Sequence, residues 1–193
     1  MEEKSCSFFG HRKIKYSEKL HERVKKTIEN LIDKEGVTAF LFGSRSEFDT
    51  LCHSIVTDLK NNYPHIKRKA YTCRSETCTL ESEREKWEEI YSHFEKRPVT
   101  LLGVEEEVEH KTKWTSGKAQ YVERNQAMID DSQYCVFYYD PYYQPPRRKY
   151  SKRSVGDYQP KSGTQLALDY ADQKKRAGKV KMIINVYEDY DEN

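Results

Sequence analysis

Short apolar segments alternate with longer amphipathic ones along most of the chain, and this alternation limits the fold more than any other feature. The run VTAFLF (37–42) is apolar without interruption, which is typical of a strand buried on both faces in the interior of a sheet. Before it, residues 17–36 carry apolar side chains at helical spacing, with Ser17 placed to cap the start and Gly36 the end. Strands that alternate with helices of this length form βαβ units with right-handed crossovers. The sequence therefore predicts an α/β fold, a doubly wound and mainly parallel sheet with helices on both faces.

The same pattern continues to the end of the chain. A helix is predicted over 46–59, with Ser46 and Asp49 spaced as a capping box. The other strands are predicted at 5–10, 66–71 (nearer an edge because it is more polar), 98–103, 133–140 and 181–186, and the other helices around 87–94, 121–129 and 163–178. An acidic and then basic connection is expected at 104–116, and an acidic, frayed tail at 188–193.

The bulk composition limits the class of protein. A length of 193 residues fits one domain, predicted over 1–193, and a net charge of +2 gives no global basic field of the kind that indicates nucleic-acid binding. No apolar run is long enough to span a membrane and the first residues do not resemble a secretory signal, so we expect a cytoplasmic protein with no membrane partner. The five cysteines suit reduced thiols. Cys73 and Cys78 lack the further ligands of a zinc site, so neither a metal nor a cofactor is expected.

Glycine-containing turns follow the first two predicted strands and precede the last helix. They are Gly10-His11-Arg12, Gly43-Ser44-Arg45 and Ser162-Gly163-Thr164. The carboxyl ends of parallel strands meet at one edge of a doubly wound sheet, where such folds bind ligands. Glycine allows close backbone approach, the arginine fork suits phosphate or carboxylate, and helix N-termini attract anions. These turns predict a phosphate-binding site, although a single Gly-His-Arg after a strand is more often an ordinary turn.

Four segments together resemble a known superfamily. They are FFGHR, FGSRSEFD, VERNQAMIDDSQYCVFYYD and SGTQLALDYADQKKRAGKVKMIINV. In this order they resemble the SLOG superfamily, the Rossmann-like clan of the Smf/DprA and LOG proteins, and most of all its small bacterial YpsA-like members. The resemblance runs from residue 5 to about 187, apart from an insertion at 141–161. It implies a single Rossmann-like domain that binds a nucleotide or nucleotide derivative as a sensor or regulator, often as a homodimer.

The LOG branch of this superfamily contains enzymes that cleave the base from a nucleoside monophosphate. Arg124, followed by Asn125, falls on the arginine that those enzymes use in catalysis. Their PGGxGTxxE signature corresponds here to PKSGTQLALD, which keeps Gly163 and Thr164 but has Leu166 and Ala167 where acidic residues are expected. The catalytic carboxylate is thus missing from its usual place. N-glycosidic hydrolysis is an alternative to binding alone only if Asp49, Glu123 or Asp140 supplies the carboxylate. Helix capping explains Asp49 equally well.

The insertion at 141–161 is rich in tyrosine and in basic residues, and its prolines exclude a continuous helix. One interpretation is a lid over a nucleotide, with tyrosine on the base and arginine on phosphate. A second is a contact with single-stranded DNA, as in the DprA branch, in which aromatic rings stack on bases. A third is a solvated, flexible loop. The composition of the insertion does not choose among them.

Overall fold

The computed structural model describes residues 3–43, 46–73, 104–110, 113, 118–143 and 161–188. Its strands are β1 (Ser5–Gly10), β2 (Ala39–Phe42), β3 (Lys67–Cys73), β4 (Glu106–His110), β5 (Tyr134–Tyr138) and β6 (Met182–Asn185). They form one sheet in the order β4-β3-β2-β1-β5-β6, and every pair of neighbours is parallel. The described helices are α1 (Glu18–Asp33), α2 (Glu47–Leu59), α4 (Lys118–Asp130) and α5 (Gly163–Arg176). The predicted doubly wound α/β fold is confirmed.

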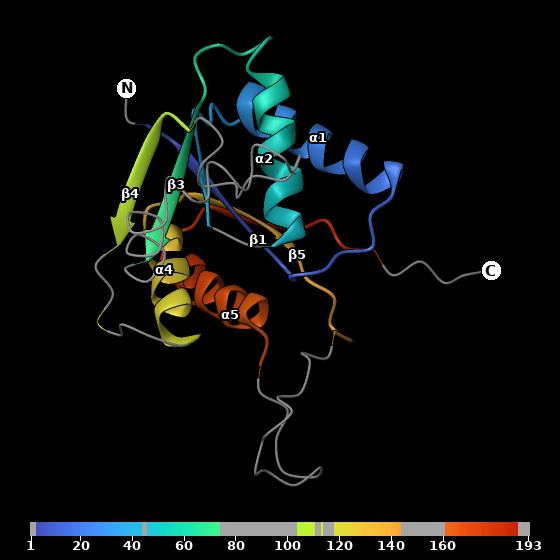
Figure 1. Cartoon of the computed structure of the whole chain (residues 1–193). Helices are drawn as coiled ribbons and strands as arrows, with labels where there is room; N and C mark the ends of the chain where they lie inside the picture. Colours follow the sequence, from blue (N-terminus) through green and yellow to red (C-terminus); the bar gives the residue numbers. More distant parts are fainter. Residues whose placement is uncertain are drawn as a thin grey trace, which may run out of the picture.

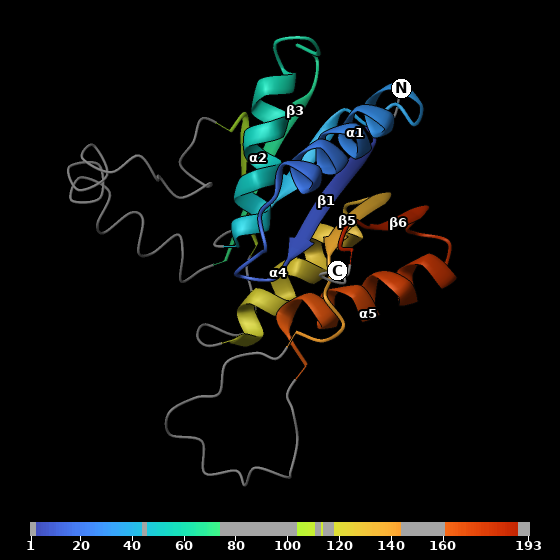
Figure 2. The same cartoon turned by 90° about the vertical axis from the view of Figure 1, so that its right-hand side faces the viewer.

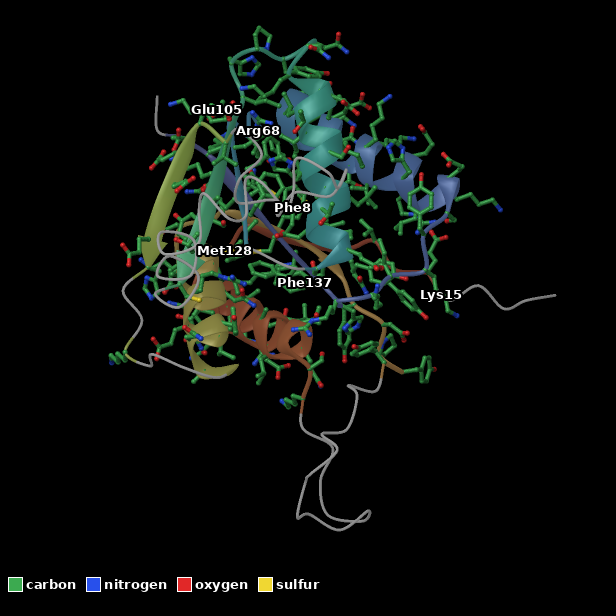
Figure 3. All side chains as sticks on the ribbon, viewed as in Figure 1. Phe8, Lys15, Arg68, Glu105, Met128 and Phe137 are labelled. Carbon is green, nitrogen blue, oxygen red and sulfur yellow. The ribbon has the colours of Figure 1, made fainter. Side chains whose placement is uncertain are left out.

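Two layers of helices enclose the sheet. Figures 1 and 2 show α1 and α2 on one face and α4 and α5 on the other. Alternate residues of the buried strands supply the two cores, so that Phe8 packs with α1 and α2 while its neighbour Phe9 packs with α4 and α5. Phe137 and Met128 belong to the second core, and Figure 3 labels both together with Phe8 of the first. This arrangement fixes the strand ends between two rigid layers.

The first two helices begin where the sequence predicts, each with a serine N-cap. The hydroxyl of Ser17 accepts a hydrogen bond from the N–H of Leu20, and that of Ser46 accepts one from the N–H of Asp49. At its other end α1 differs from the prediction: the helix stops at Asp33 with Lys34 as its C-cap, so Gly36 lies beyond the cap, where its φ of 71° is a left-handed conformation that favours glycine. The strand predicted at 66–71 is β3, one position in from the edge, as its polarity indicated. The predictions at 87–94 and 98–103 lie outside the described residues.

The edge strand β4 corrects the sequence prediction, because it lies inside the segment 104–116 that was expected to be a connection. Its residues EEVEH show no apolar alternation, and only Val108 packs against a core. Opposite charge explains the pairing: Glu106 faces Lys69 in the register and forms an ion pair with it at 2.9 Å. An edge strand contacts the sheet on one side only and can therefore carry exposed charges.

An ion pair between buried Arg68 and partly exposed Glu105 closes the amino end of β3 and β4. Arg68 donates from Nη2 to Oε1 of Glu105 at 2.9 Å and from its backbone N–H to Oε2 at 2.7 Å, and its Nη1 donates to Thr57 of α2 at 2.8 Å. Figure 3 shows Arg68 and Glu105 together at that end of the sheet. Although burial alone raises the pKa of Glu105, the hydrogen bonds from Arg68 lower it to about 2. This network ties α2 to the edge of the sheet.

The start of the acidic tail is held against α1. Nη1 of Arg23 donates to the carbonyl oxygen of Val186 at 2.7 Å, and Nη2 donates to the carboxylate of Glu188. Tyr187 packs at the margin of the α1 and α2 core. The rest of the tail that we expect to be frayed, 189–193, lies outside the described residues.

Candidate functional site

The strand order reverses between β1 and β5. From β1 the chain builds β2, β3 and β4 to one side, and it then places β5 and β6 on the other. In doubly wound folds the crevice at such a switch point, at the carboxyl ends of the strands, is the usual ligand site. Gly10 ends β1, and Tyr138, followed by Tyr139 and Asp140, ends β5. Part of the predicted site therefore lies at the switch point itself.

His11 lies at this switch point and is almost entirely buried, with 2% of its surface exposed. Its Nε2 accepts a hydrogen bond from the backbone N–H of Asp140 at 3.1 Å. Burial lowers the pKa of His11 against a smaller opposing effect of Asp140, so the ring is neutral near pH 7 and carries its proton on Nδ1. That Nδ1 is buried and has no hydrogen-bond partner among the described residues. The ring of Tyr143 stacks on the imidazole with 3.9 Å between centroids.

Gly10 and Arg12, on either side of His11, connect the end of β1 to helix α2. A Cβ built on Gly10 would lie 2.3 Å from Cβ of Phe48, so glycine at this position is what lets α2 pack against β1. The carbonyl oxygen of Arg12 accepts a hydrogen bond from the N–H of Glu47 at 3.1 Å, and the side chain of Arg12 is exposed. Of the three residues in this turn, the histidine is the one buried at the switch point.

Arg124 reaches from α4 to the end of β2. A Cβ built on Gly43 would lie 3.0 Å from Nη2 and 3.2 Å from Cζ of Arg124, so the guanidinium lies directly against the glycine backbone. The side chain is 5% exposed, donates to Oδ1 of Asn125 at 3.2 Å and lies over the ring of Tyr121. The structure thus brings together Gly43 and the Arg124–Asn125 pair, which are about eighty residues apart in the sequence. Ser44 and Arg45 lie outside the described residues.

The Ser162-Gly163-Thr164 turn begins helix α5. The hydroxyl of Ser162 accepts a hydrogen bond from the N–H of Gln165 at 3.1 Å, which caps the helix. The N–H groups of Gly163 and Thr164 are in the first turn, where a helix offers no acceptor of its own. Apart from its chain neighbours and the backbone of its own helix, no described atom lies within 4 Å of a Cβ built on Gly163.

Three carboxylates were named from the sequence as substitutes for the missing acidic residue of the LOG signature. Asp49 is buried in the first turn of α2, at the carboxyl edge of the sheet. The carboxylate of Asp140 accepts a hydrogen bond from the N–H of Tyr142 at 2.8 Å, and that of Glu123 accepts one from the N–H of Lys113 at 2.7 Å. Ala167 packs in the core under α5, whereas Leu166 is exposed.

Sequence reasoning missed two residues that the structure adds to this region. Tyr143 had been counted only as part of the 141–161 insertion, and nothing in its local pattern signals that it stacks on His11. Gln120 is buried on α4, one turn before Arg124, and its Oε1 has no hydrogen-bond partner among the described residues. Its spacing of four from Arg124 places both on one helix face and was the available signal.

Most of the insertion, 144–160, lies outside the described residues, so its role as a lid or a DNA contact stays a prediction, as does the homodimer. Within the described part of the chain, no three His, Cys, Asp or Glu side chains are grouped so as to hold a metal. Cys78, one of the two cysteines considered for zinc, is not described. Burial raises the pKa of Cys135 to about 12, which favours the protonated thiol. None of the described helices has the length and apolar character to cross a membrane.

Comparison with known proteins supports the resemblance seen in the sequence. No curated protein matches this chain. The model of the YspA SLOG family, which bears the name YpsA, matches residues 4–174. That range includes β1 to β5, the switch point, Arg124 and most of α5. Because the match covers most of the 193 residues, the chain belongs to the YspA SLOG family.

Proposed function

We propose that this protein binds a nucleotide or a nucleotide-derived ligand at the carboxyl ends of β1, β2 and β5, and acts as a sensor or regulator. The observation that carries the proposal is the contact between Arg124 and Gly43, because it holds a buried guanidinium at the edge where doubly wound folds bind their ligands. A guanidinium offers several donors in one plane and matches the oxygens of a phosphate. Membership of the SLOG family supports the same ligand class.

The other groups at this edge suit the remaining parts of such a ligand. The amides of Gly163 and Thr164, in the first turn of α5, offer an anion site of the kind that binds phosphate in many nucleotide-binding folds. His11, at the switch point, adds a neutral aromatic ring, one face of which is stacked by Tyr143 in this structure. The site thus combines positive and polar donors for phosphate with an aromatic surface for a base.

A thermal-unfolding screen tests this proposal. The purified protein is heated with nucleoside mono-, di- and triphosphates, NAD, ADP-ribose, cyclic nucleotides and a short single-stranded oligonucleotide. A ligand that binds only the folded state raises the midpoint by mass action, and we expect a rise with at least one small nucleotide. The rise should disappear in Arg124→Ala and persist in Arg176→Ala, which removes an exposed arginine at the far end of α5. No rise with any small nucleotide at millimolar concentration contradicts the proposal, and a rise with the oligonucleotide alone favours the DNA-binding alternative.

A hydrolase is the second candidate, and the buried carboxylate of Asp49 is the observation in its favour. Cleavage of an N-glycosidic bond passes through a cationic sugar, which a nearby carboxylate stabilises. With Ala167 in the core, the LOG position provides no carboxylate, and Asp49 supplies one from α2. Chromatography of nucleotides incubated with the protein tests this: free base that appears with the wild type and not with Asp49→Asn supports hydrolysis, and its absence with every nucleotide leaves binding alone.

A further inference from the structure

The stack of Tyr143 on His11 is unlike the other aromatic contacts at the switch point. The two rings are 3.9 Å apart and inclined by only 19°, whereas Tyr138 and Tyr139 meet His11 at 6.4 Å and 6.0 Å with larger angles. A parallel stack at this distance is how a planar base packs on an aromatic side chain. Tyr143 therefore lies on His11 as a nucleobase would.

The stack with Tyr143 also leaves one polar group of His11, its Nδ1–H, without a hydrogen-bond partner among the described residues. Its Nε2 is used by the N–H of Asp140, so the proton is on Nδ1, and that Nδ1–H is buried without a partner among the described residues. Buried polar groups in native structures almost always have a partner, and a group that lacks one calls for an explanation such as a ligand. The imidazole is thus ready to donate one hydrogen bond that Tyr143, stacked on its face, does not accept.

Tyr143 is the member of this cluster best placed to move. It is partly exposed, two residues beyond Pro141, whereas Tyr138 belongs to β5 and is buried. Its neighbour Tyr142 is 75% exposed and makes no ring contact with His11 among those described. Displacement of the Tyr143 ring would remove the parallel stack on the imidazole without requiring a residue of β1 or β5 to move.

We propose that Tyr143 occupies the base subsite of the nucleotide site in the ligand-free protein. When a nucleotide binds, its base takes the place of the Tyr143 ring on His11, and an oxygen of its ribose or phosphate accepts the Nδ1–H. The tyrosine is therefore an internal competitor that lowers the affinity for ligands with a base and has no effect on a sugar phosphate. This inference rests on the proposed function, since it assigns the base-binding part of the same site.

The test compares AMP, GMP, CMP and UMP with ribose 5-phosphate, which lacks the base, by titration calorimetry. Loss of the competing stack in Tyr143→Ala should tighten binding of the nucleotides by about 2- to 10-fold and leave ribose 5-phosphate unchanged. Tyr143→Phe keeps a ring and should return the affinity to the wild-type value. Tyr142→Ala is the matched control, because it removes the neighbouring tyrosine that does not stack, and it should bind as the wild type does.

Two results separate the failure of this inference from the failure of the proposed function. If wild type binds a nucleotide in a way that requires Arg124, but Tyr143→Ala binds it equally or more weakly, the nucleotide site stands and the displacement is wrong. If neither wild type nor Tyr143→Ala binds these four nucleotides or any other small nucleotide of the thermal screen, both are wrong. NMR of the unmodified protein gives a readout that needs no variant: the ring protons of Tyr143 should lose the shift caused by the His11 ring when the nucleotide is added, and retention of that shift in the complex overturns the proposal.

Discussion

The two ends of the sheet each hold a buried arginine, and the two arginines are used differently. At the amino end, Arg68 is 8% exposed and is fixed by the carboxylate of Glu105 and the hydroxyl of Thr57. At the carboxyl end, Arg124 is 5% exposed and lies against the backbone of Gly43, beside the strand-order switch. The same residue type at similar burial joins elements of the fold in one place and faces the proposed ligand site in the other. In the function that we propose, position in the topology, more than residue type or burial, separates the structural arginine from the ligand-binding one.

Gly10 is an exception to this comparison between the two ends of the sheet, because it lies at the carboxyl end and yet its role is in packing. Gly10→Ala would place a methyl group 2.3 Å from Cβ of Phe48, and neither the strand nor the start of α2 can yield easily. We expect a loss of about 3 kcal/mol or more in the free energy of unfolding, at the upper end of the range for overpacking. Urea unfolding measures it. A stability within 1 kcal/mol of the wild type would show that α2 is free to shift away from β1.

The pH dependence of stability offers a further test of the role of Arg68, through the neighbouring His53. Burial, with a further contribution from the charge of Arg68, lowers the pKa of His53 to about 4. The unfolded chain binds a proton at this residue below about pH 6.5 while the folded protein stays neutral, so stability present at pH 7 is lost as the pH falls from about 6.5 to 4. The loss from this residue is at most roughly 3 kcal/mol.

Urea unfolding between pH 8 and pH 4 checks this dependence. His53→Leu should flatten the curve in that window, because the titrating group is gone. An equally steep curve in the variant would assign the dependence to other groups, among them His11, whose pKa burial also lowers.

The direct comparison replaces each arginine by methionine, which keeps much of the side-chain length. Arg68→Met leaves Glu105 with Lys60 as its remaining cation and should cost about 2 kcal/mol, less than for a fully buried pair because Glu105 is partly exposed. It should leave nucleotide affinity unchanged. Arg124→Met should lower that affinity at least tenfold in a protein that still unfolds cooperatively. Unfolding curves and calorimetric titrations of both variants measure these effects. A loss of affinity in Arg68→Met together with a loss of stability alone in Arg124→Met would reverse the roles assigned to the two arginines.

Two glycines test how closely the ligand approaches the strand ends. Gly43→Ala forces the guanidinium of Arg124 to move by a few tenths of an ångström, and we expect roughly a tenfold loss of nucleotide affinity, or about 1.4 kcal/mol, with little change in stability. A Cβ at Gly163 meets no described residue beyond its own turn, so we expect little change in stability in Gly163→Ala, and a loss of affinity would report a ligand close to that position. Calorimetric titration of both variants checks this. Unchanged affinity in both would place the ligand away from this edge.

Much of the fold was predictable because its signals are local. The buried runs of β1, β2 and β5 and the Ser17 and Ser46 caps follow from periodicity and side-chain chemistry within a few residues. β4 was missed because its stability comes from charges on a neighbouring strand, Lys69 against Glu106, and the sequence EEVEH carries no strand period. Strand pairing of this kind is a tertiary effect that overrides local propensity.

The candidate site was predictable in part, for a related reason. That the glycine turns belong to one edge followed from the topology of a parallel sheet, whereas Arg124 was assigned to the site only through its resemblance to the LOG arginine. The role of each glycine depends on tertiary contacts that the sequence does not show. Gly10 packs against Phe48 and Gly43 against Arg124, whereas a Cβ on Gly163 would meet no described residue beyond its own turn. The stack between Tyr143 and His11 joins residues 132 positions apart and has no local signature.

The most direct test of the central claim is an amide NMR titration of the isotope-labelled protein with whichever nucleotide stabilises it. Ligand at the proposed edge should shift the amide signals of Gly43, Gly163 and Asp140 together, and leave those of Thr57, Arg68 and Glu105 at the opposite end nearly unmoved. Shifts confined to the amino end, or to α1 and β6 with the three strand-end amides unchanged, would contradict the placement of the ligand and the role given to Arg124.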